Sequence, residues 1–192
     1  MIQLQIIVGM SGASGIIYGL RLLEVLKEIG VKTHLVLTEG CKKLINLESE
    51  YHIEDLELLA STVYKIDDIS APIASGSFKT DGMVVIPCSM KTLAGIACGY
   101  SDNLLLRAAD VTIKERRTLV LVVRESPLSP IHLENMLKLA RIGVCIMPAS
   151  PPFYGKPKTI QELVNAIVGK VLDIFKIEHK IYKRWGKVDE LD

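Results

Sequence analysis

A short apolar run that ends abruptly in two charges is the feature that most restricts how this chain can fold. Residues 119–123 read Leu-Val-Leu-Val-Val, and Arg124 and Glu125 follow with no turn between. A strand this apolar is typical of a sheet covered on both faces, whereas burying an unpaired charge costs several kcal/mol. In an open α/β sheet, ligands bind at the carboxyl ends of the strands. Arg124 is therefore a candidate anion clamp and Glu125 a candidate proton carrier.

The remainder of the chain alternates short apolar runs with segments of helical periodicity. Strands are expected at 4–9, 32–37, 82–87, 119–123 and 143–147, and helices at 16–29, 39–47, 89–98, 103–114, 131–141 and 159–175. The stretch 48–70 is polar and reads as irregular, apart from a short helical piece at 55–59. This alternation predicts a single α/β domain over residues 1–192, with a three-layer, doubly wound (Rossmann or flavodoxin-like) and mostly parallel sheet.

Composition argues against several classes of function. Basic and acidic residues nearly balance, 23 against 22, so neither nucleic acid nor a membrane surface is an expected partner. No apolar run reaches the ~18 residues of a membrane span. The four cysteines show no Cys-x-x-Cys spacing and the four histidines no metal-like spacing, so no metal site is expected. Free thiols without an export signal lead us to expect a cytoplasmic protein.

A glycine-rich turn joins the first expected strand to the first expected helix. It reads Gly-Met-Ser-Gly-Ala-Ser-Gly over residues 9–15. Glycines allow the backbone to approach a ligand closely, and a helix N-terminus attracts phosphate. Ser11 and Ser14 would add hydroxyl donors. The pattern is neither the dinucleotide Gly-x-Gly-x-x-Gly nor Walker A. It favours a phosphate-bearing ligand, with a tight turn that binds nothing as the alternative.

Two further loops carry hydroxyl groups. The loop 73–78 is small and polar, and alone it is best read as an ordinary turn. In the loop 87–92, Ser89 and Thr92 stand at the N-cap and N3 positions of the next helix, where they could donate to a ligand. Cys88, beside them, is expected to be buried and structural rather than nucleophilic, because no histidine is paired with it in the sequence.

With these pieces in place, the chain resembles the UbiX family of flavin prenyltransferases over about residues 6–185. None of the matching pieces is diagnostic alone, but nine occur in the family's order. They are Gly12-Ala-Ser-Gly15, Ala74-Ser-Gly-Ser77, Pro87-Cys-Ser89, Arg107-Ala-Ala-Asp110, Lys114-Glu-Arg-Arg117, Arg124-Glu125, His132-Leu-Glu-Asn-Met-Leu137, Phe153-Tyr154 and Arg184-Trp-Gly186.

The resemblance implies a flavodoxin-like fold, assembly as a homododecamer and binding of FMN. It also implies a metal-independent reaction. A dimethylallyl group would pass from dimethylallyl phosphate to N5 and C6 of reduced FMN. The product, prenylated FMN, would serve UbiD-type decarboxylases.

The resemblance also assigns roles to particular residues. Cofactor binding falls on Gly12, Ala13, Ser14, Thr38, Ser89, Met90, Lys91, Thr92, Arg107 and Arg124. Binding of the prenyl phosphate falls on Ser75, Lys114, Tyr154 and Lys170, together with Arg124 and Glu125. Catalysis falls on Ser14, Glu48, Lys114, Arg124 and Glu125. The tail, residues 178–192, contains the only tryptophan, Trp185, and is expected to pack on a neighbouring subunit.

The residues alone leave some of these roles open. Without the resemblance, Glu48 would be read as a solvated loop carboxylate, Lys170 as an exposed helix charge and Tyr154 equally as loop packing. Three positions depart from the family's pattern. Lys170 stands where other members have arginine, and lysine lacks the bidentate fork that grips phosphate. Val123 replaces a common proline, and Ile69 replaces a tryptophan near the prenyl site.

Three other functions are alternatives, and the sequence argues against each of them. An FMN-dependent cysteine-type decarboxylase would carry Pro-x-Met-Asn, and the nearest match, Met147-Pro-Ala149, lacks the asparagine. A non-catalytic flavin carrier would not need a second phosphate site. An NAD-dependent reductase would place an acidic residue where Thr38 stands. The sequence does not choose between a mono- and a diphosphate donor.

Overall fold

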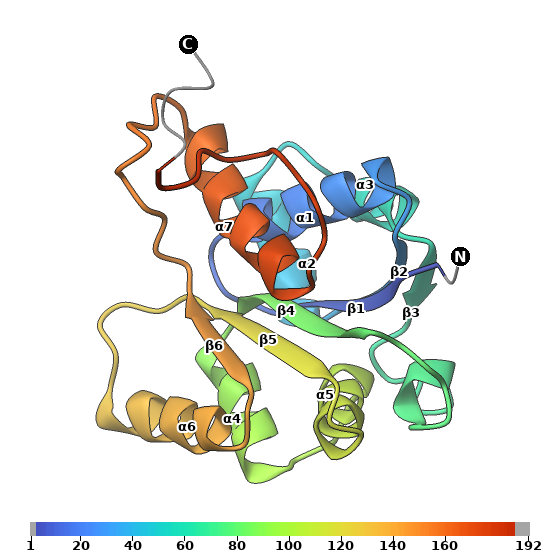
Figure 1. Ribbon diagram of the computed structural model, residues 1–192. Helices are drawn as coiled ribbons and strands as arrows, with labels where there is room; N and C mark the ends of the chain where they lie inside the picture. The colour runs from blue at the N-terminus through green and yellow to red at the C-terminus, as the bar shows by residue number, and fades with distance from the viewer. Residues whose placement is uncertain (1–2, 187–192) are drawn as a thin grey trace.

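The computed structural model describes residues 3–186 and contains a six-stranded sheet in which every neighbouring pair is parallel (Figure 1). The strand order is β3-β2-β1-β4-β5-β6. The strands are β1 (Gln5–Met10), β2 (Lys32–Leu37), β3 (Thr62–Tyr64), β4 (Gly82–Cys88), β5 (Thr118–Val123) and β6 (Cys145–Pro148).

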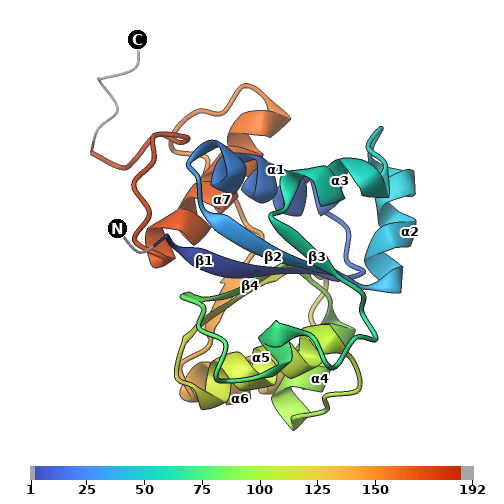
Figure 2. The same ribbon diagram turned by 90° about the vertical axis from the view of Figure 1, so that its right-hand side faces the viewer.

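Helices cover both faces of this sheet, so the molecule has three layers (Figures 1 and 2). On one face lie α1 (Ile16–Glu28), α2 (Glu39–Glu48), α3 (Ile53–Leu59) and α7 (Ile160–Ile174). The other face carries the 3-10 turn η1 (Pro72–Ala74), α4 (Met90–Cys98), α5 (Leu104–Lys114) and α6 (Pro130–Arg141). Strand side chains alternate between the two apolar cores, which confirms the predicted doubly wound architecture.

The direction of the winding reverses between β1 and β4, and this position fixes where a ligand can bind. From β1 the chain moves outward to β2 and β3, then returns to the centre and moves outward the other way through β4, β5 and β6. Helix α1 therefore packs on one face and α4 on the other. The turns that follow β1 and β4 separate there and open a crevice at the carboxyl ends of the strands.

The expected boundaries agree with the structure to within two residues, except in the stretch 48–70. That stretch was expected to be irregular apart from a short helical piece. It also contains the strand β3, which pairs only with β2 at the edge of the sheet. Its three residues are exposed or only partly buried, so they lack the apolar alternation by which a strand is recognised.

Candidate active site

One buried serine joins the glycine turn to the turn after β4. The Ser11 hydroxyl donates to the Pro87 carbonyl (3.0 Å) and accepts the backbone N–H of Ser89 (2.8 Å). Ser11 is only 1% exposed. The prediction that this hydroxyl contacts a ligand is therefore wrong, because both of its hydrogen bonds are made inside the protein. Residues 9–15 and 87–92 together form a single unit, called the platform below.

Glu48, the last residue of α2, reaches back to the start of α1. One of its carboxylate oxygens accepts the backbone N–H groups of Gly15 (2.8 Å) and Ile16 (3.2 Å). Gly15 caps α1 with a φ of 102°, a conformation that favours glycine. The positive end of the α1 dipole thus holds a carboxylate. The structure brings Glu48 to the glycine turn beside Ser14, rather than leaving it in a solvated loop.

The neighbouring turns place backbone and hydroxyl groups on the same edge of the sheet. A Cβ on Gly12 would lie 3.0 Å from the Gly40 Cα, so the β1 and β2 turns approach each other closely. Thr38 caps α2 by accepting the Cys41 N–H (3.2 Å). Ser89 caps α4 by accepting the Thr92 N–H (3.3 Å). The predicted cofactor residues after β1, β2 and β4 therefore form one continuous rim.

Cys88, at the end of β4, is fully buried. Burial raises the pKa of its thiol well above the usual value. The thiolate required of a nucleophile is thus strongly disfavoured, and the prediction of a structural cysteine is confirmed.

Arg124 and Glu125 extend this rim at the end of β5. The Arg124 N–H donates to the Cys88 carbonyl (3.3 Å), and both side chains are exposed. Burial raises the pKa of Tyr18 on α1, and the nearby Arg124 guanidinium partly offsets that increase. The Arg124 guanidinium is thus close enough to Tyr18 to influence it electrostatically. The Glu125 carboxylate accepts the N–H of its neighbour Ser126 (2.9 Å).

Lys114 and Ser75 lie together at the opposite, amino-terminal edge of the sheet. A Cβ on Gly76 would lie 2.7 Å from the Lys114 Nζ, so the loop after Ser75 packs against the end of α5. The Arg117 guanidinium, just before β5, donates to the carbonyls of Gly76 (2.7 Å) and Phe78 (2.8 Å). This loop is therefore anchored beside the first residue of β5.

The length of β5 separates Lys114 from Arg124. Six strand residues at ~3.3 Å each span about 20 Å, much more than a side chain can bridge. Lys114 also forms an ion pair with Glu115, and that ammonium lowers the pKa of the Glu115 carboxyl. Within one chain, the structure does not bring the predicted phosphate ligands Lys114 and Ser75 to Arg124.

Arg107 lies on the same flank of α5 as Lys114. Its Nε donates to the Ala74 carbonyl (3.1 Å) and its guanidinium pairs with Asp110 (2.7 Å). Its position, too, is fixed by the loop that leads to Ser75. Within residues 3–186, no group of three or more His, Cys, Asp or Glu side chains could hold a metal ion.

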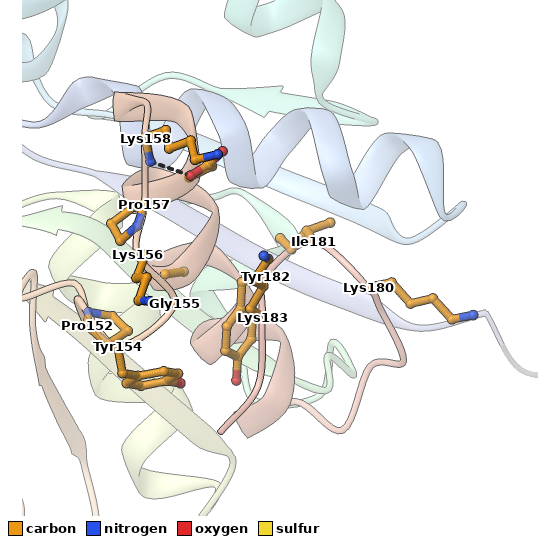
Figure 3. A pocket seen from close by; sticks show the side chains of 12 residues that line it. Pro152, Tyr154, Gly155, Lys156, Pro157, Lys158, Lys180, Ile181, Tyr182 and Lys183 are labelled. Atoms are coloured by element: carbon orange, nitrogen blue, oxygen red, sulfur yellow. Dashed lines mark hydrogen bonds between the residues drawn. The ribbon is translucent and has the colours of Figure 1, made fainter. Parts of the chain in front are cut away.

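Tyr154 and Lys170 belong to a third region, in which the loop after β6 faces the tail. A pocket of about 400 Å³ lies between the two segments (Figure 3). The Tyr154 ring meets the Trp185 ring edge-on, with centroids 5.2 Å apart. The Lys170 Nζ lies 5.9 Å from the centroid of the Tyr182 ring.

The tail segment, residues 178–186, packs against α7 of its own chain. Its anchor is Asp173, whose carboxylate accepts the Tyr182 hydroxyl (2.7 Å) and pairs with Arg184 (2.6 Å). Sequence reasoning missed Asp173, although the only acid in the last two turns of this helix, followed by a tail with basic and aromatic residues, could have signalled it. Residues 187–192 of the predicted interface lie outside the described residues, and packing on a neighbour stays a prediction.

Comparison with known proteins gives a consistent result. The family model "Flavoprotein" matches residues 1–172. The flavin prenyltransferase UbiX of Methanocaldococcus jannaschii is 49% identical over 185 residues, which is 96% of this chain and 100% of that protein. The mitochondrial flavin prenyltransferase PAD1 of Saccharomyces cerevisiae is also 49% identical, over 94% of this chain and 75% of the yeast protein.

Two solved structures are similar throughout. AnUbiX (PadA1), in complex with FMN and dimethylallyl pyrophosphate, superposes with a TM-score of 0.95 at 46% identity, over 96% of this chain and 98% of that one. A dodecameric, FMN-dependent UbiX-like decarboxylase of Escherichia coli O157:H7 gives 0.93 at 52% identity, over 95% and 99%. The peptidyl-cysteine decarboxylase EpiD, at 18% identity and a TM-score of 0.66, shares the fold alone.

Among residues 3–186, no helix combines the length and the apolarity needed to cross a bilayer. The family match covers most of the chain and the identity to UbiX proteins extends over nearly its full length. The chain belongs to the flavoprotein family and, within it, to the UbiX-type flavin prenyltransferases.

Proposed function

We propose that this enzyme transfers a dimethylallyl group from dimethylallyl phosphate to N5 and C6 of reduced FMN, without a metal. The observation that carries the proposal is the preformed rim at the β1–β4 switch point, where the platform contacts Glu48 through Gly15 and Arg124 through the Cys88 carbonyl. This rim supplies backbone groups, a carboxylate and a cation beside one crevice, as expected where a flavin and an anionic donor react.

We assign FMN to the crevice between the turns after β1 and β4. Its ligands would be residues 12–14, Thr38, residues 89–92 and Arg124. The fit rests on the close approach of the β1 and β2 turns and on the N-termini of α2 and α4, which begin there. When bound and reduced, the flavin supplies electron-rich ring atoms to the allyl group. The chain's part is to hold the ring against the donor, since orientation accounts for much of the rate in such reactions.

We assign the phosphate of the donor to cations drawn from two copies of the chain. Arg124, Tyr154 and Lys170 would come from one copy. Because Lys114 lies about 20 Å from Arg124 along β5, and the loop after Ser75 packs against Lys114, we propose that a second copy supplies both residues, together with Arg107.

A homododecamer, the assembly of the Escherichia coli relative, would create such shared sites. Exposed apolar side chains on α6 support association: Ile131, Leu133 and Leu137 are each more than half exposed.

The residues of the rim have distinct chemical tasks. As the C–O bond of the donor breaks, negative charge develops on the leaving phosphate, and Lys114, Arg124 and Lys170 stabilise it. The allyl carbon bonds to N5, which loses its proton. Ring closure then adds one proton to the former allyl double bond, joins its tertiary carbon to C6 and releases the C6 proton. Glu48 and Ser14 lie beside α1 to accept or relay that proton, and the departing phosphate or Glu125 offers an alternative acceptor.

We further propose that prenylated FMN passes to a UbiD-type decarboxylase and that the enzyme works in the cytoplasm. The product would then serve as the cofactor of that decarboxylase.

The proposal is tested by anaerobic incubation of the purified protein with reduced FMN and dimethylallyl monophosphate, followed by mass spectrometry of the extracted flavin. A flavin heavier by one five-carbon unit is expected. A parallel reaction with the diphosphate establishes the donor preference. Unmodified FMN in both reactions, from protein that binds FMN, would contradict the proposal and favour a flavin-bound decarboxylase or carrier.

A further inference from the structure

Asp173, near the end of α7, accepts hydrogen bonds from several residues outside its own helix. Its carboxylate accepts the Tyr182 hydroxyl (2.7 Å) and both terminal nitrogens of Arg184 (3.1 and 2.6 Å). The His179 Nε2 lies 3.1 Å from the same carboxylate. Because the His179 Nδ1 accepts the Ile181 N–H, Nε2 carries the proton and donates to Asp173. Three residues of the tail segment thus converge on a single carboxylate.

The protonation states in this cluster agree with the hydrogen-bond directions. Although partial burial opposes it, donation from Arg184, Tyr182 and His179 lowers the pKa of Asp173 below its usual value. Burial and the hydrogen bond to Asp173 raise the pKa of Tyr182 to about 12. Around neutral pH the acceptor is therefore ionised and the phenol is a donor. Charge-assisted bonds of this kind are about twice as strong as neutral ones.

The tail segment fastened by Asp173 contacts two of the side chains assigned above to the donor phosphate, Lys170 and Tyr154. Tyr182 lies beneath the Lys170 ammonium (5.9 Å to the ring centroid), a distance at which a cation is attracted to the ring face. Trp185, next to Arg184, packs edge-on against Tyr154. Tyr182 also forms a wall of the pocket opposite Tyr154 (Figure 3).

The contact between the tail and α7 is specific in shape as well as charge. A Cβ on Gly169 would lie 2.2 Å from the Tyr182 ring, so the ring fits only because position 169 is glycine. The Tyr182 ring stacks on His179, with centroids 5.6 Å apart and planes inclined by 28°. The tail segment therefore packs in one defined position on α7, the helix that carries Lys170.

We propose that Asp173 is a positioning residue for the prenyl-transfer reaction. By fastening the tail segment to α7, it holds Tyr154 and Lys170 where they bind the phosphate of the donor. This inference rests on the proposed function, but it concerns Asp173, a residue that is assigned no direct contact with flavin or donor. It predicts that loosening the tail weakens binding of the donor and leaves binding of FMN unchanged.

The test compares Asp173→Asn with Glu178→Gln, which removes the charge of an exposed carboxylate in the tail itself. Two quantities are measured. The first is KM for dimethylallyl monophosphate and for reduced FMN, with kcat. The second is the fluorescence anisotropy of Trp185, which is the only tryptophan in the chain and so reports on the tail alone.

For Asp173→Asn we expect donor KM to rise about tenfold, with FMN KM and kcat within about threefold of the wild type, because ground-state binding is lost. Trp185 anisotropy should fall as the tail loosens. Glu178→Gln should change neither quantity. Arg184→Gln removes an exposed partner of the same carboxylate and should reproduce the effect if Asp173→Asn fails to fold.

Three results would overturn the inference. Unchanged donor KM in both variants, with reduced anisotropy, would show that the tail does not position the phosphate ligands. Unchanged anisotropy would show that Asp173 does not fasten the tail. Wild-type enzyme that prenylates no flavin would refute the proposed function and this inference with it, and the wild-type reaction reveals that case before any variant is compared.

Discussion

The two edges of the sheet carry parts of the same expected site but are built in different ways. At the carboxyl edge, backbone groups and short side chains lock the platform, through Ser11 and the Glu48 carboxylate. At the amino edge, the loop that carries Ser75 is braced by long side chains. Arg117 donates to its carbonyls, and Phe78 packs edge-on against His34 of β2 (5.2 Å between ring centroids).

This difference indicates which parts of the expected active site a single chain can bring together. At the carboxyl edge, one chain brings together the turns assigned to the flavin, whereas Lys114 lies at the amino edge, paired with Glu115. If both edges serve one reaction, each copy contributes half of two different sites. The following predictions test that division, beginning with the largest expected effect.

The first prediction concerns the separation of Lys114 from Arg124. Lys114→Ala and Arg124→Ala should each lower the rate of flavin prenylation about a thousandfold, as expected when a group that stabilises developing charge is removed. If the site is shared, unfolding and refolding the two variants together should restore activity. Random mixing would regenerate about one site in four with both cations.

The control is each variant refolded alone, with mass spectrometry of the flavin as the measurement. Activity in the mixture no greater than in the separate samples would mean that Lys114 and Arg124 do not meet across copies, and the shared site would have to be abandoned. A mixture of Lys114→Ala with wild type serves as the reference for refolding yield.

The same contrast explains how much could be predicted from the sequence. The carboxyl edge follows from local patterns: apolar strands, the glycine turn, and N-caps such as Ser89 can be recognised within a few residues of each other. The hydrogen bonds of Ser11 could not be foreseen, because they join turns 78 positions apart in the sequence. The placement of Lys114, by contrast, follows from the predicted helix 103–114 and strand 119–123, because the helix that leads into a parallel strand ends at the amino end of that strand.

In the tail, too, a contact between separate segments could not be predicted from local sequence patterns. The Arg184-Trp185 piece was recognised, but its anchor Asp173 lies 11 positions earlier in an amphipathic helix. Sequence patterns report periodicity within an element, whereas this contact depends on how the chain turns back after α7.

The second prediction is acid sensitivity of the amino edge through His34. Burial, assisted by the Lys32 cation, lowers the pKa of His34 to about 4, whereas an unfolded histidine titrates near 6.5. Below pH 6.5 the unfolded chain gains a proton that the folded protein takes up only near pH 4. Protonation therefore favours unfolding, and about 3 kcal/mol of stability should be lost between pH 7 and pH 4.

Urea unfolding of the wild type and His34→Gln at both pH values measures this loss. Carboxyl groups titrate over the same range, so the quantity of interest is the difference between the two proteins. Glutamine keeps a polar group near Tyr64 and Gln5, the hydrogen-bond partners of His34. Equal acid destabilisation of both proteins would show that His34 does not titrate in this way.

The third prediction compares the hydroxyl groups of the two edges directly. Ser11→Ala leaves the buried Ser89 N–H without its acceptor and should lower the free energy of unfolding by about 2 kcal/mol. Ser77→Ala at the amino edge removes only an exposed hydrogen bond to Ser75 and should cost less than about 0.5 kcal/mol. Urea midpoints measure both. Similar losses in the two variants would contradict the difference in construction argued above.

The last and smallest effect is expected at Lys170, the position at which this chain departs from the family's arginine. Lys170→Arg restores a planar fork that can grip a phosphate with two parallel hydrogen bonds. It should also keep the contact with the Tyr182 ring, since guanidinium groups stack on aromatic faces. Donor KM should therefore fall about threefold, with FMN KM unchanged.

Steady-state kinetics with the monophosphate and the diphosphate donor measure this change in KM and show whether it depends on the number of phosphate oxygens. The diphosphate offers more oxygens to a bidentate partner, so its KM should fall at least as much as that of the monophosphate. Lys180→Arg, an exposed tail lysine, is the matched control and should leave both values unchanged. A donor KM that stays constant or rises in Lys170→Arg would mean that the side chain at position 170 does not bind phosphate. In the copy that supplies Arg124, the cations assigned to the phosphate would then reduce to Arg124, and the phosphate would depend more heavily on Lys114 of the second copy.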